Sequence, residues 1–354
     1  MPLVTRKVFV DTQSFVKAGL NFNSRAIDAF RNLCAVEDLE HLTTTVTISE
    51  VRNKIQEHIG EGLNKFNEFR RKAGILSGST DERTASLFAE LDGQEVERAA
   101  LAIFDDFIAD SRATVLNVSS VDPEEVFRRY FNQIAPFQSG KKKEEFPDAF
   151  VMLALAANLK EQESIYIVSE DGDLRAFCEN DNRFISIDSL AKVLDHYNSH
   201  DNERSEFIKN YIVEKNLEIK AAIKQQVEGA EFYNRSTWED SYVVAQSVLN
   251  VDEFEPDIIE IDDEFCIVAL STSIRYEVEV EGPDFVNAVY DREAGKLFSF
   301  GETKRKDEGE IKLPVEIEII LDVRDHKFVA TDFNVSVMGL SGGVEVSVEE
   351  TEYH

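Results

Sequence analysis

Five acidic residues lie just after predicted strands or at the starts of predicted helices: Asp11, Glu50, Asp148, Asp171 and Asp173. In an open α/β sheet, chemistry collects outside the carboxyl ends of the strands. Carboxylates that meet there form an all-oxygen site of the kind that Mg²⁺ and Mn²⁺ prefer. Two such ions together can promote the hydrolysis of a phosphodiester bond. The order and spacing of these acids therefore predict a hydrolytic metal site within residues 1–200.

Short apolar runs, typical of buried parallel strands, alternate with helical patterns through residues 1–200. The predicted strands cover residues 7–10, 42–48, 114–118, 164–168 and 183–187. The main predicted helices cover residues 24–34, 50–59, 63–72, 82–92, 94–109, 123–134 and 146–159. This alternation predicts a central parallel sheet with helices on both faces.

The predicted helix at residues 123–134 has a clear start. Asp122 precedes Pro123, which is the combination expected of an N-cap followed by proline at the first helical position. Further along this helix, Phe127, Tyr130 and Phe131 have the spacing of a helix core. We therefore expect these three rings to be core residues rather than a surface on which nucleic-acid bases stack.

The pattern changes after about residue 200. Residues 201–235 form a long mixed-charge helical stretch, which we expect to be an arm or linker between domains. Residues 236–354 are β-rich, and the alternation over Ile274–Val280 is typical of a strand with one buried face. Glycine-containing stretches such as residues 282–284 predict turns between such strands. The sequence thus predicts an α/β domain over residues 1–200, the arm, and a mostly antiparallel β domain.

The chain is strongly acidic, with 38 Lys and Arg against 69 Asp and Glu and a formal net charge of −31. Residues 201–354 carry 15 Lys and Arg against 36 Asp and Glu, a net of −21. Such a charge disfavours general nucleic-acid binding through a positive field. It disfavours a nuclease less, because bound divalent ions reverse the local charge of the site.

The three cysteines, Cys34, Cys178 and Cys266, are far apart and have no C-x-x-C spacing. Their spacing disfavours a disulfide framework or a zinc site and favours a reducing compartment. The sequence shows no signal-peptide pattern and no apolar window of about 20 residues, the length that a membrane span needs. We expect a cytoplasmic protein that is not bound to a membrane.

Four short motifs together resemble those of the PIN domain family, and more narrowly its large PIN-like branch with helices inserted between the second and third acids. The resemblance covers roughly residues 5–195. The motifs are Val8-Phe9-Val10-Asp11-Thr12, Ile48-Ser49-Glu50-Val51, Asp148-Ala149 at the start of an apolar helix, and Val168-Ser169-Glu170-Asp171-Gly172-Asp173-Leu174. Their order and spacing carry the resemblance, since each motif alone is short.

The resemblance implies a three-layer PIN-like domain that hydrolyses RNA, or less often structured DNA, with Mg²⁺ or Mn²⁺. Asp11, Glu50 and Asp148 match the first, second and third acids of the family. Asp171 and Asp173 match the acidic pair after the later strand. The resemblance also places the hydroxyl groups of two residues, Thr12 and Ser169, where they support the carboxylates.

Three consecutive lysines, Lys141, Lys142 and Lys143, precede Asp148 and could contact a nucleic-acid backbone, although a solvated loop explains them equally well. The acidic C-terminal region could hold the nuclease inactive by competing for its basic residues. It could equally be a docking surface for a regulatory protein partner. By analogy of architecture, a toxin-like or antiviral-defence nuclease fits this arrangement.

Two other classes of function remain open from the sequence. The N-terminal domain could be a catalytically inactive scaffold that binds protein or RNA. Alternatively, the whole chain could be an interaction module whose acidic β domain is the functional part. Metal binding separates the classes, because a ligand that binds only the native state raises its melting temperature.

Overall fold

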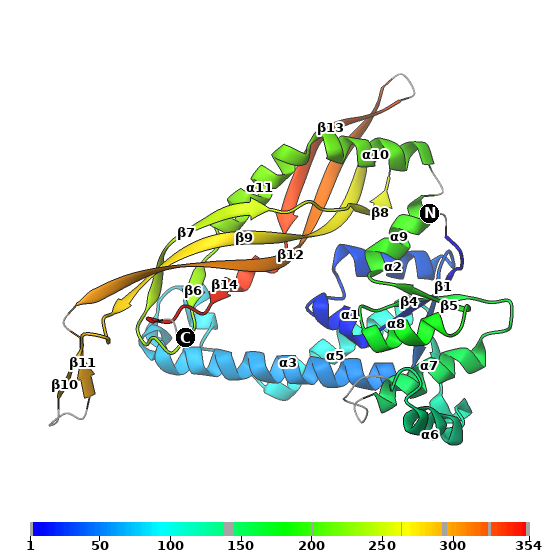
Figure 1. Cartoon of the computed structure of the whole chain (residues 1–354), viewed down its shortest axis with the longest axis horizontal. Coiled ribbons are helices and arrows are strands. Elements are labelled where there is room, and N and C mark those ends of the chain that lie inside the picture. Colours follow the sequence, from blue (N-terminus) through cyan, green and yellow to red (C-terminus); the bar gives the residue numbers. More distant parts are fainter. Residues whose placement is uncertain are drawn as a thin grey trace. The chain divides into compact units, whose positions relative to one another are not determined.

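The computed structural model describes residues 3–137, 145–199, 202–262, 264–291, 296–299, 301–324 and 327–351. The chain forms two compact units, Met1–His200 and Asp201–His354 (Figure 1). We describe each unit by itself.

The N-terminal unit is built on a five-stranded parallel sheet in the order β3-β2-β1-β4-β5. The strands are β1 (Lys7–Val10), β2 (Glu40–Thr44), β3 (Thr114–Leu116), β4 (Ile165–Val168) and β5 (Phe184–Ile187). All four residues of β4 are buried, as are Val8, Phe9 and Val10 of β1. Continuous apolar runs are expected of strands that are covered on both faces.

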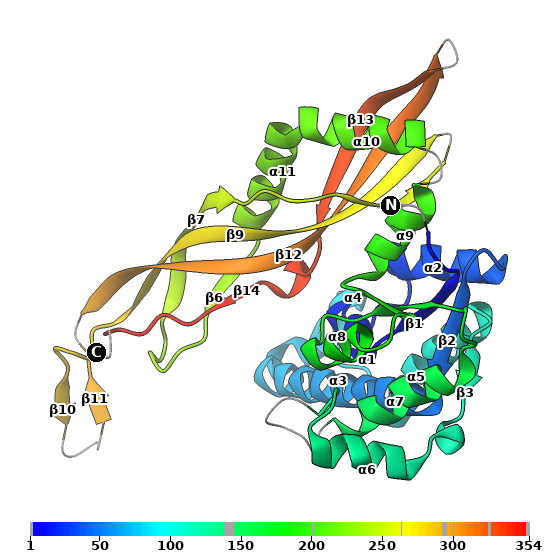
Figure 2. The ribbon, with the colours of Figure 1, turned by 45° about the vertical axis from the view of Figure 1, so that its right-hand side comes forward.

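Helices cover both faces of this sheet (Figure 2). The α-helices are α1 (Thr12–Lys17), α2 (Arg25–Ala35), α3 (Thr45–Lys72), α4 (Glu82–Ser86), α5 (Gly93–Asp110), α6 (Pro123–Asn132), α7 (Phe146–Asn158), α8 (Gly172–Glu179) and α9 (Leu190–Asn198), with 3₁₀ turns η1 (Gly74–Gly78) and η2 (Val118–Ser120). Phe9 and Ile167 share a buried cluster with residues of α7 and α8. On the other face, the ring of His41 contacts Phe30 of α2 and Phe107 of α5. The predicted three-layer α/β/α class is confirmed.

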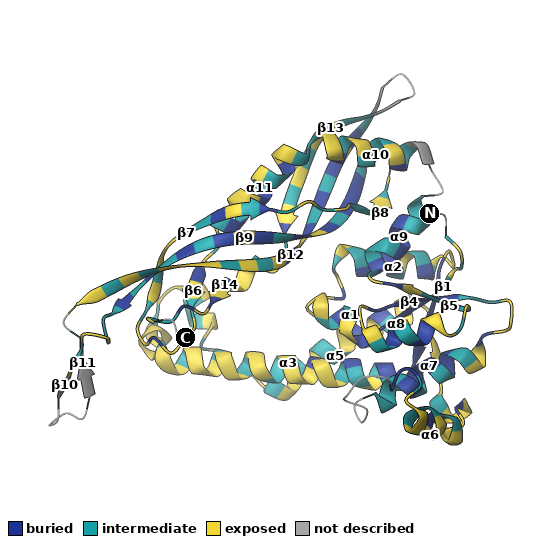
Figure 3. Ribbon diagram, in the orientation of Figure 1, coloured by how far each residue is buried: buried dark blue, intermediate teal, exposed yellow. Residues whose placement is uncertain are grey.

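The structure differs from the sequence prediction at the start of α3. Residues 42–48 were expected to form one strand, but β2 ends at Thr44 and the helix begins at Thr45. The hydroxyl of Thr44 accepts a hydrogen bond from the backbone N–H of Thr47 at 3.1 Å and caps the helix. Two predicted helices, at 50–59 and 63–72, are one continuous α3, whose C-terminal part is largely exposed (Figure 3). The helix predicted at 82–92 is shorter and ends at Ser86.

The C-terminal unit contains an antiparallel sheet in the order β13-β12-β9-β7, with β8 pairing with β9. Its strands are β7 (Tyr242–Val251), β8 (Asp257–Ile261), β9 (Phe265–Pro283), β12 (Glu302–Arg324) and β13 (Lys327–Val337). Two smaller pairs are β6 (Phe232–Asn234) with β14 (Val344–Val346), and β10 (Val289–Asp291) with β11 (Lys296–Phe298). A short 3₁₀ turn, η3 (Leu340–Gly342), precedes β14. The predicted antiparallel β class is confirmed for this unit.

The stretch expected to be an arm forms two helices, α10 (Asn202–Glu214) and α11 (Asn216–Glu228). Their buried residues, including Ile212, Ile219 and Ile223, join the same apolar cluster as the inward-facing residues of the sheet. The helical stretch is therefore part of the core of the C-terminal unit.

One predicted turn lies inside a strand. Gly282 and Pro283 are the last two residues of β9 rather than a turn. The indole of Trp238 packs so close to Gly282 that a Cβ there would lie 2.7 Å from the ring. Trp238 also donates a hydrogen bond from Nε1 to the carbonyl of Pro283 at 2.8 Å. Gly282 is thus explained by close packing and not by a turn.

Candidate active site

A pocket of about 450 Å³ lies at the carboxyl ends of the central strands of the N-terminal unit. The chain builds the sheet outward from β1 in one direction and from β4 in the other, so the junction of these two strands is the topological switch point. Asp11 directly follows β1, and Asp171 lies three residues after β4. Both line the pocket, together with Glu50 and Asp148. The fold thus brings four of the five predicted acids to one place.

Asp11 is held by the neighbouring strand. Its backbone N–H donates to the carbonyl of Val168 at 3.1 Å, and its Oδ2 accepts a hydrogen bond from Ser169 Oγ at 3.0 Å. Ser169 Oγ in turn accepts from the backbone N–H of Asp171 at 3.0 Å. One buried hydroxyl therefore fixes the acids that follow β1 and β4 relative to each other.

Glu50 reaches the pocket from the early part of α3. Thr12 Oγ1 donates a hydrogen bond to Glu50 Oε2 at 2.9 Å. Thr12 is itself buried, with 9% of its surface exposed. The Thr44 cap fixes where α3 starts, and this start places Glu50 one and a half turns into the helix on the pocket side.

Asp148 and Asp171 belong to the starts of two further helices. Asp148 lies in the first turn of α7, where the helix dipole favours negative charge. Asp171 is the N-cap of α8 and accepts from the backbone N–H groups of Asp173 and Leu174 at 2.6 and 3.2 Å. The side chain of Asp173 is not among the residues that line the pocket. Asp173 is thus the one predicted acid that does not line the pocket.

The carboxyl groups of the pocket lie close enough for their charges to affect the protonation of Asp148 and Asp11. Burial and the charges of Asp11, Glu50, Glu145 and Asp171 raise the pKa of Asp148 to about 8. Burial also raises the pKa of Asp11 to about 6, against the opposing hydrogen bond from Ser169. The pKa of Glu50 is raised by burial as well, while Thr12 and Lys54 oppose that rise. The pocket therefore carries excess negative potential that a cation would relieve.

Three further residues of α3 line the pocket and were not singled out from the sequence. They are Asn53, Lys54 and Glu57, which follow Glu50 by three, four and seven residues. This is the spacing of one helix face, so the signal was present once Glu50 was placed on a helix. Lys54 Nζ pairs with Glu57 Oε2 at 2.7 Å, so the acidic residues that line the pocket still outnumber its one lysine.

The donor set fits a hard divalent cation. Carboxylate oxygens are the ligands that Mg²⁺ and Mn²⁺ prefer, and the raised pKa values mark a place where positive charge is favoured. Within the described part of the chain, no three His, Cys, Asp or Glu side chains are already grouped as a set of metal ligands. The three lysines predicted as backbone contacts, Lys141, Lys142 and Lys143, lie outside the described residues.

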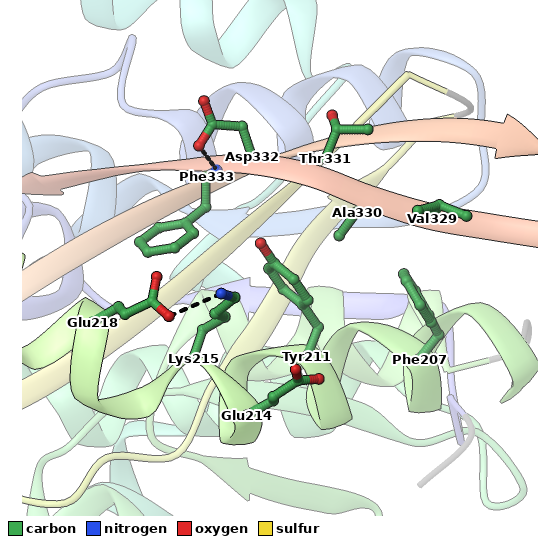
Figure 4. Close-up of a pocket in the computed structure, with 10 residues that line it drawn as sticks. All are labelled: Phe207, Tyr211, Glu214, Lys215, Glu218, Val329, Ala330, Thr331, Asp332 and Phe333. Atoms are coloured by element: carbon green, nitrogen blue, oxygen red, sulfur yellow. Dashed lines mark hydrogen bonds and ion pairs between the residues drawn. The ribbon is translucent and has the colours of Figure 1, made fainter.

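A second groove, of about 460 Å³, belongs to the C-terminal unit alone and runs between α10, α11 and β13 (Figure 4). The rings of Tyr211 and Phe333 meet edge to face there, with centroids 6.4 Å apart. Lys215 in this groove pairs with Glu218 at 2.8 Å. Burial raises the pKa of Tyr211, and the charge of Asp332 acts in the same direction while that of Lys215 opposes it. The groove thus combines aromatic walls with acidic side chains.

None of the described helices is both long enough and apolar enough to cross a membrane.

A comparison with protein families matches residues 8–174 to the PIN domain. No curated protein and no solved structure matches the chain. The matched segment contains all five predicted acids and four of the five strands of the parallel sheet. PIN domains are generally metal-dependent nucleases that use divalent ions such as Mg²⁺ or Mn²⁺ on nucleic acid. The N-terminal unit of this chain is therefore a PIN-like domain.

Proposed function

We propose that this protein is a metal-dependent endoribonuclease. The observation that carries the proposal is the convergence of Asp11, Glu50, Asp148 and Asp171 on one pocket at the switch point of the sheet. Four acids from four separate segments meet there, and burial together with the charges of the neighbouring carboxylates raises the pKa of Asp148. A pocket in which four carboxylates converge supports a divalent cation and, with it, phosphodiester hydrolysis.

Asp11, Asp148 and Asp171 are the proposed metal ligands, and Glu50 completes the set. When bound, Mg²⁺ or Mn²⁺ would neutralise phosphate charge and lower the pKa of water. Ser169 and Thr12 position Asp11 and Glu50 through the hydrogen bonds described above. Asp173 supports the site from the first turn of α8, because its backbone N–H orients the Asp171 carboxylate.

The test is cleavage of a labelled single-stranded RNA, with a DNA strand of the same sequence alongside, in Mn²⁺, Mg²⁺ or EDTA. We expect RNA cleavage that needs the metal and falls by about 100-fold or more in Asp11→Asn and Asp148→Asn. Asp106→Asn, an exposed acid of α5, is the matched control and should cleave like wild type. Equal cleavage by all four proteins would contradict the proposal, and preferred cleavage of the DNA strand would reassign the substrate.

The inactive scaffold is the competing class of function, and a metal-binding measurement separates the two. The nuclease proposal requires that Mn²⁺ raise the melting temperature of the wild-type protein and not that of Asp11→Asn. A scaffold that retains no metal site would melt at the same temperature with and without Mn²⁺.

We assign the C-terminal unit to substrate or partner recognition or to regulation of cleavage. The acidic, aromatic groove beside β13 supports a basic protein partner, because its carboxylates exceed its one lysine. We expect residues 1–200 to cleave RNA faster than the whole chain if the second unit restrains the site. Equal rates would restrict the second unit to recognition.

The cellular setting is proposed as cytoplasmic, which the three buried free cysteines support. A toxin-like or antiviral-defence role follows from analogy of architecture. Expression in a bacterial host should then slow growth, and Asp11→Asn should restore it. Normal growth with active wild-type protein would contradict the toxin-like role.

A further inference from the structure

The first turn of α7, which carries Asp148, packs beside a group of aromatic rings on α6. Phe127, Tyr130 and Phe131 come from α6, and Phe146 is the first residue of α7. The sequence prediction placed the three α6 rings in the core. The structure contradicts this for two of them, because Phe127 is 51% exposed and Phe131 is 74% exposed.

The exposed rings are arranged as a stack. The centroids of Phe127 and Phe131 are 6.3 Å apart, and their planes differ by 25°. They lie one helical turn apart on α6, so their separation follows from the pitch of the helix. A flat solute could continue such a row of near-parallel rings.

Partly buried rings fix this stack in place. Phe146 meets Phe127 edge to face, with centroids 5.8 Å apart, and lies 5.0 Å from Tyr130. Tyr130 in turn packs edge to face on Phe137, which is completely buried. Phe127 is therefore held in place by the packed rings beneath it, so the stack is rigid rather than mobile.

The position of the stack points to its ligand. Phe146 precedes the proposed metal ligand Asp148 by two residues in the same helical turn. Phe146 also contacts Phe127, so one helical turn and one ring contact connect the proposed metal ligand to the stack. Aromatic side chains bind unpaired bases in a sequence-tolerant way, because every base has a π face. Arg128, an exposed cation of α6 in the described part of the chain, is already paired with Glu125 at 2.6 Å, so its charge is partly neutralised and stacking is the interaction that the two rings themselves provide.

We propose that Phe127 and Phe131 form a stacking platform for unpaired bases of the nucleic-acid strand that occupies the carboxylate pocket. This site deepens the proposed nuclease function and rests on it for the identity of the strand. The platform favours single-stranded substrates, since paired bases keep their faces stacked within the duplex.

The test uses the full wild-type chain in Ca²⁺, a larger carboxylate-binding ion chosen in place of Mg²⁺ so that the strand is held at the pocket without being consumed. Fluorescence anisotropy measures the binding of a labelled single-stranded RNA and of the same strand with abasic residues. We expect Phe127→Leu with Phe131→Leu to weaken binding of the base-bearing strand by about tenfold or more, without changing binding of the abasic strand. Phe127→Tyr with Phe131→Tyr should restore binding. Phe69→Leu, an exposed ring of α3 that is 41% exposed, is the matched control.

Each outcome decides one of the two proposals separately. Unchanged binding by the leucine pair, equal loss on both strands, or no binding of the base-bearing strand would overturn the platform. A leucine pair that alters only self-association, measured by sedimentation, would assign the rings to a contact between copies of the chain. Ring-dependent binding of bases without any cleavage by wild type would keep the platform and overturn the nuclease. RNA cleavage that does not depend on the rings would keep the nuclease proposal and overturn the platform.

Discussion

At the scale of single residues, Asp148 is a side chain whose charge the folded protein strongly disfavours. Its pKa is about 8 in the folded protein, against an ordinary value of 3.8. Between these values the folded state keeps a proton that the unfolded state has released. The free energy of unfolding must therefore fall as the pH rises through this window. This group stabilises the fold in acid and disfavours it above neutrality.

Replacing Asp148 by Asn should therefore stabilise the metal-free protein at pH 8. We expect a gain of about 1–2 kcal/mol in the free energy of unfolding. This is less than a pKa raised from 3.8 to about 8 would give at about 1.4 kcal/mol per unit, because Asp148 is only partly buried, solvent screens its charge, and the lost helix-dipole interaction offsets a further part. Urea unfolding in EDTA measures this. Asp106→Asn should leave the free energy unchanged. A destabilised Asp148→Asn protein would show that this carboxyl group is not under electrostatic strain.

His41 has the opposite effect on the pH dependence. It is 2% exposed, and burial lowers the pKa of its imidazole to about 3 from an ordinary 6.5. Its Nδ1 lies 2.8 Å from Ser111 Oγ, so the neutral ring is hydrogen-bonded inside the core. Between pH 6.5 and 3 the unfolded state binds a proton that the folded state does not. Stability from this residue is therefore complete above pH 6.5 and is lost as the pH falls.

The prediction is that wild type loses stability in acid more steeply than His41→Leu. The difference should reach about 1.4 kcal/mol per pH unit below pH 6. Urea unfolding at intervals from pH 7.5 to pH 4.5 measures it, and comparing the two proteins cancels the contribution of the carboxyl groups. Parallel curves for the two proteins would mean that His41 becomes protonated without unfolding.

At the scale of elements, the sequence predicts most of the N-terminal sheet, because buried parallel strands are continuous apolar runs. The ranges expected for β1, β4 and β5 agree with the structure to within one residue. Asp122 caps α6 and accepts from the N–H of Glu124, as its position before Pro123 predicted. These features depend only on local chemistry.

The prediction was wrong where a long-range contact or a cap overrides local propensity. The threonines and valine before Ile48 favour a strand, but the hydrogen bonds between Thr47 and the Thr44 hydroxyl start a helix there. The exposure of Phe127 and Phe131 has the same cause. Periodicity shows that they share a helix face, but it does not show whether another element covers that face. The convergence of the acids was predictable from strand order, whereas the absence of Asp173 from the pocket depends on how Asp171 caps α8.

Helix α11 has a second role that the sequence did not reveal, which is to close both edges of the C-terminal sheet. On the β13 edge, Gln226 Nε2 donates to the carbonyl of Val335 at 2.6 Å, and its Oε1 accepts from the N–H of Val337 at 2.9 Å. On the β7 edge, the N–H of Val248 donates to Glu228 Oε1 at 2.9 Å. These side chains replace the partner strand that an open edge would otherwise recruit.

Gln226→Ala should therefore lower the free energy of unfolding of the C-terminal unit by about 1–3 kcal/mol, since two backbone groups of β13 lose their partner. It should also increase self-association, because it exposes a strand edge. Guanidinium unfolding and sedimentation at two concentrations measure the two effects. The exposed neighbour Gln225→Ala is the control, and equal behaviour of the two variants would exclude an edge-closing role.

At the scale of the whole molecule, each unit has its own apolar core. The core of the C-terminal unit includes Ile223, which is completely buried, and its described members all lie beyond residue 200. The clusters around α7 and the parallel sheet consist entirely of residues from the N-terminal unit. Because the acids of the pocket all lie in the first unit, a metal ion should stabilise that unit alone.

Calorimetry should therefore resolve two unfolding transitions that respond to different changes. Mn²⁺ at about 100 times its dissociation constant should stabilise one transition by about 2.7 kcal/mol, and Asp11→Asn should abolish this effect. Ile223→Ala should lower the other transition by about 2–5 kcal/mol, because it leaves a cavity in the second core. Each change is the control for the other, since Mn²⁺ should not move the transition of the C-terminal unit and Ile223→Ala should not move that of the N-terminal unit. A single transition that both changes shift would show that the two units unfold together. The acidic unit would then directly affect the stability of the unit that holds the metal site, and this coupling would allow it to regulate the nuclease.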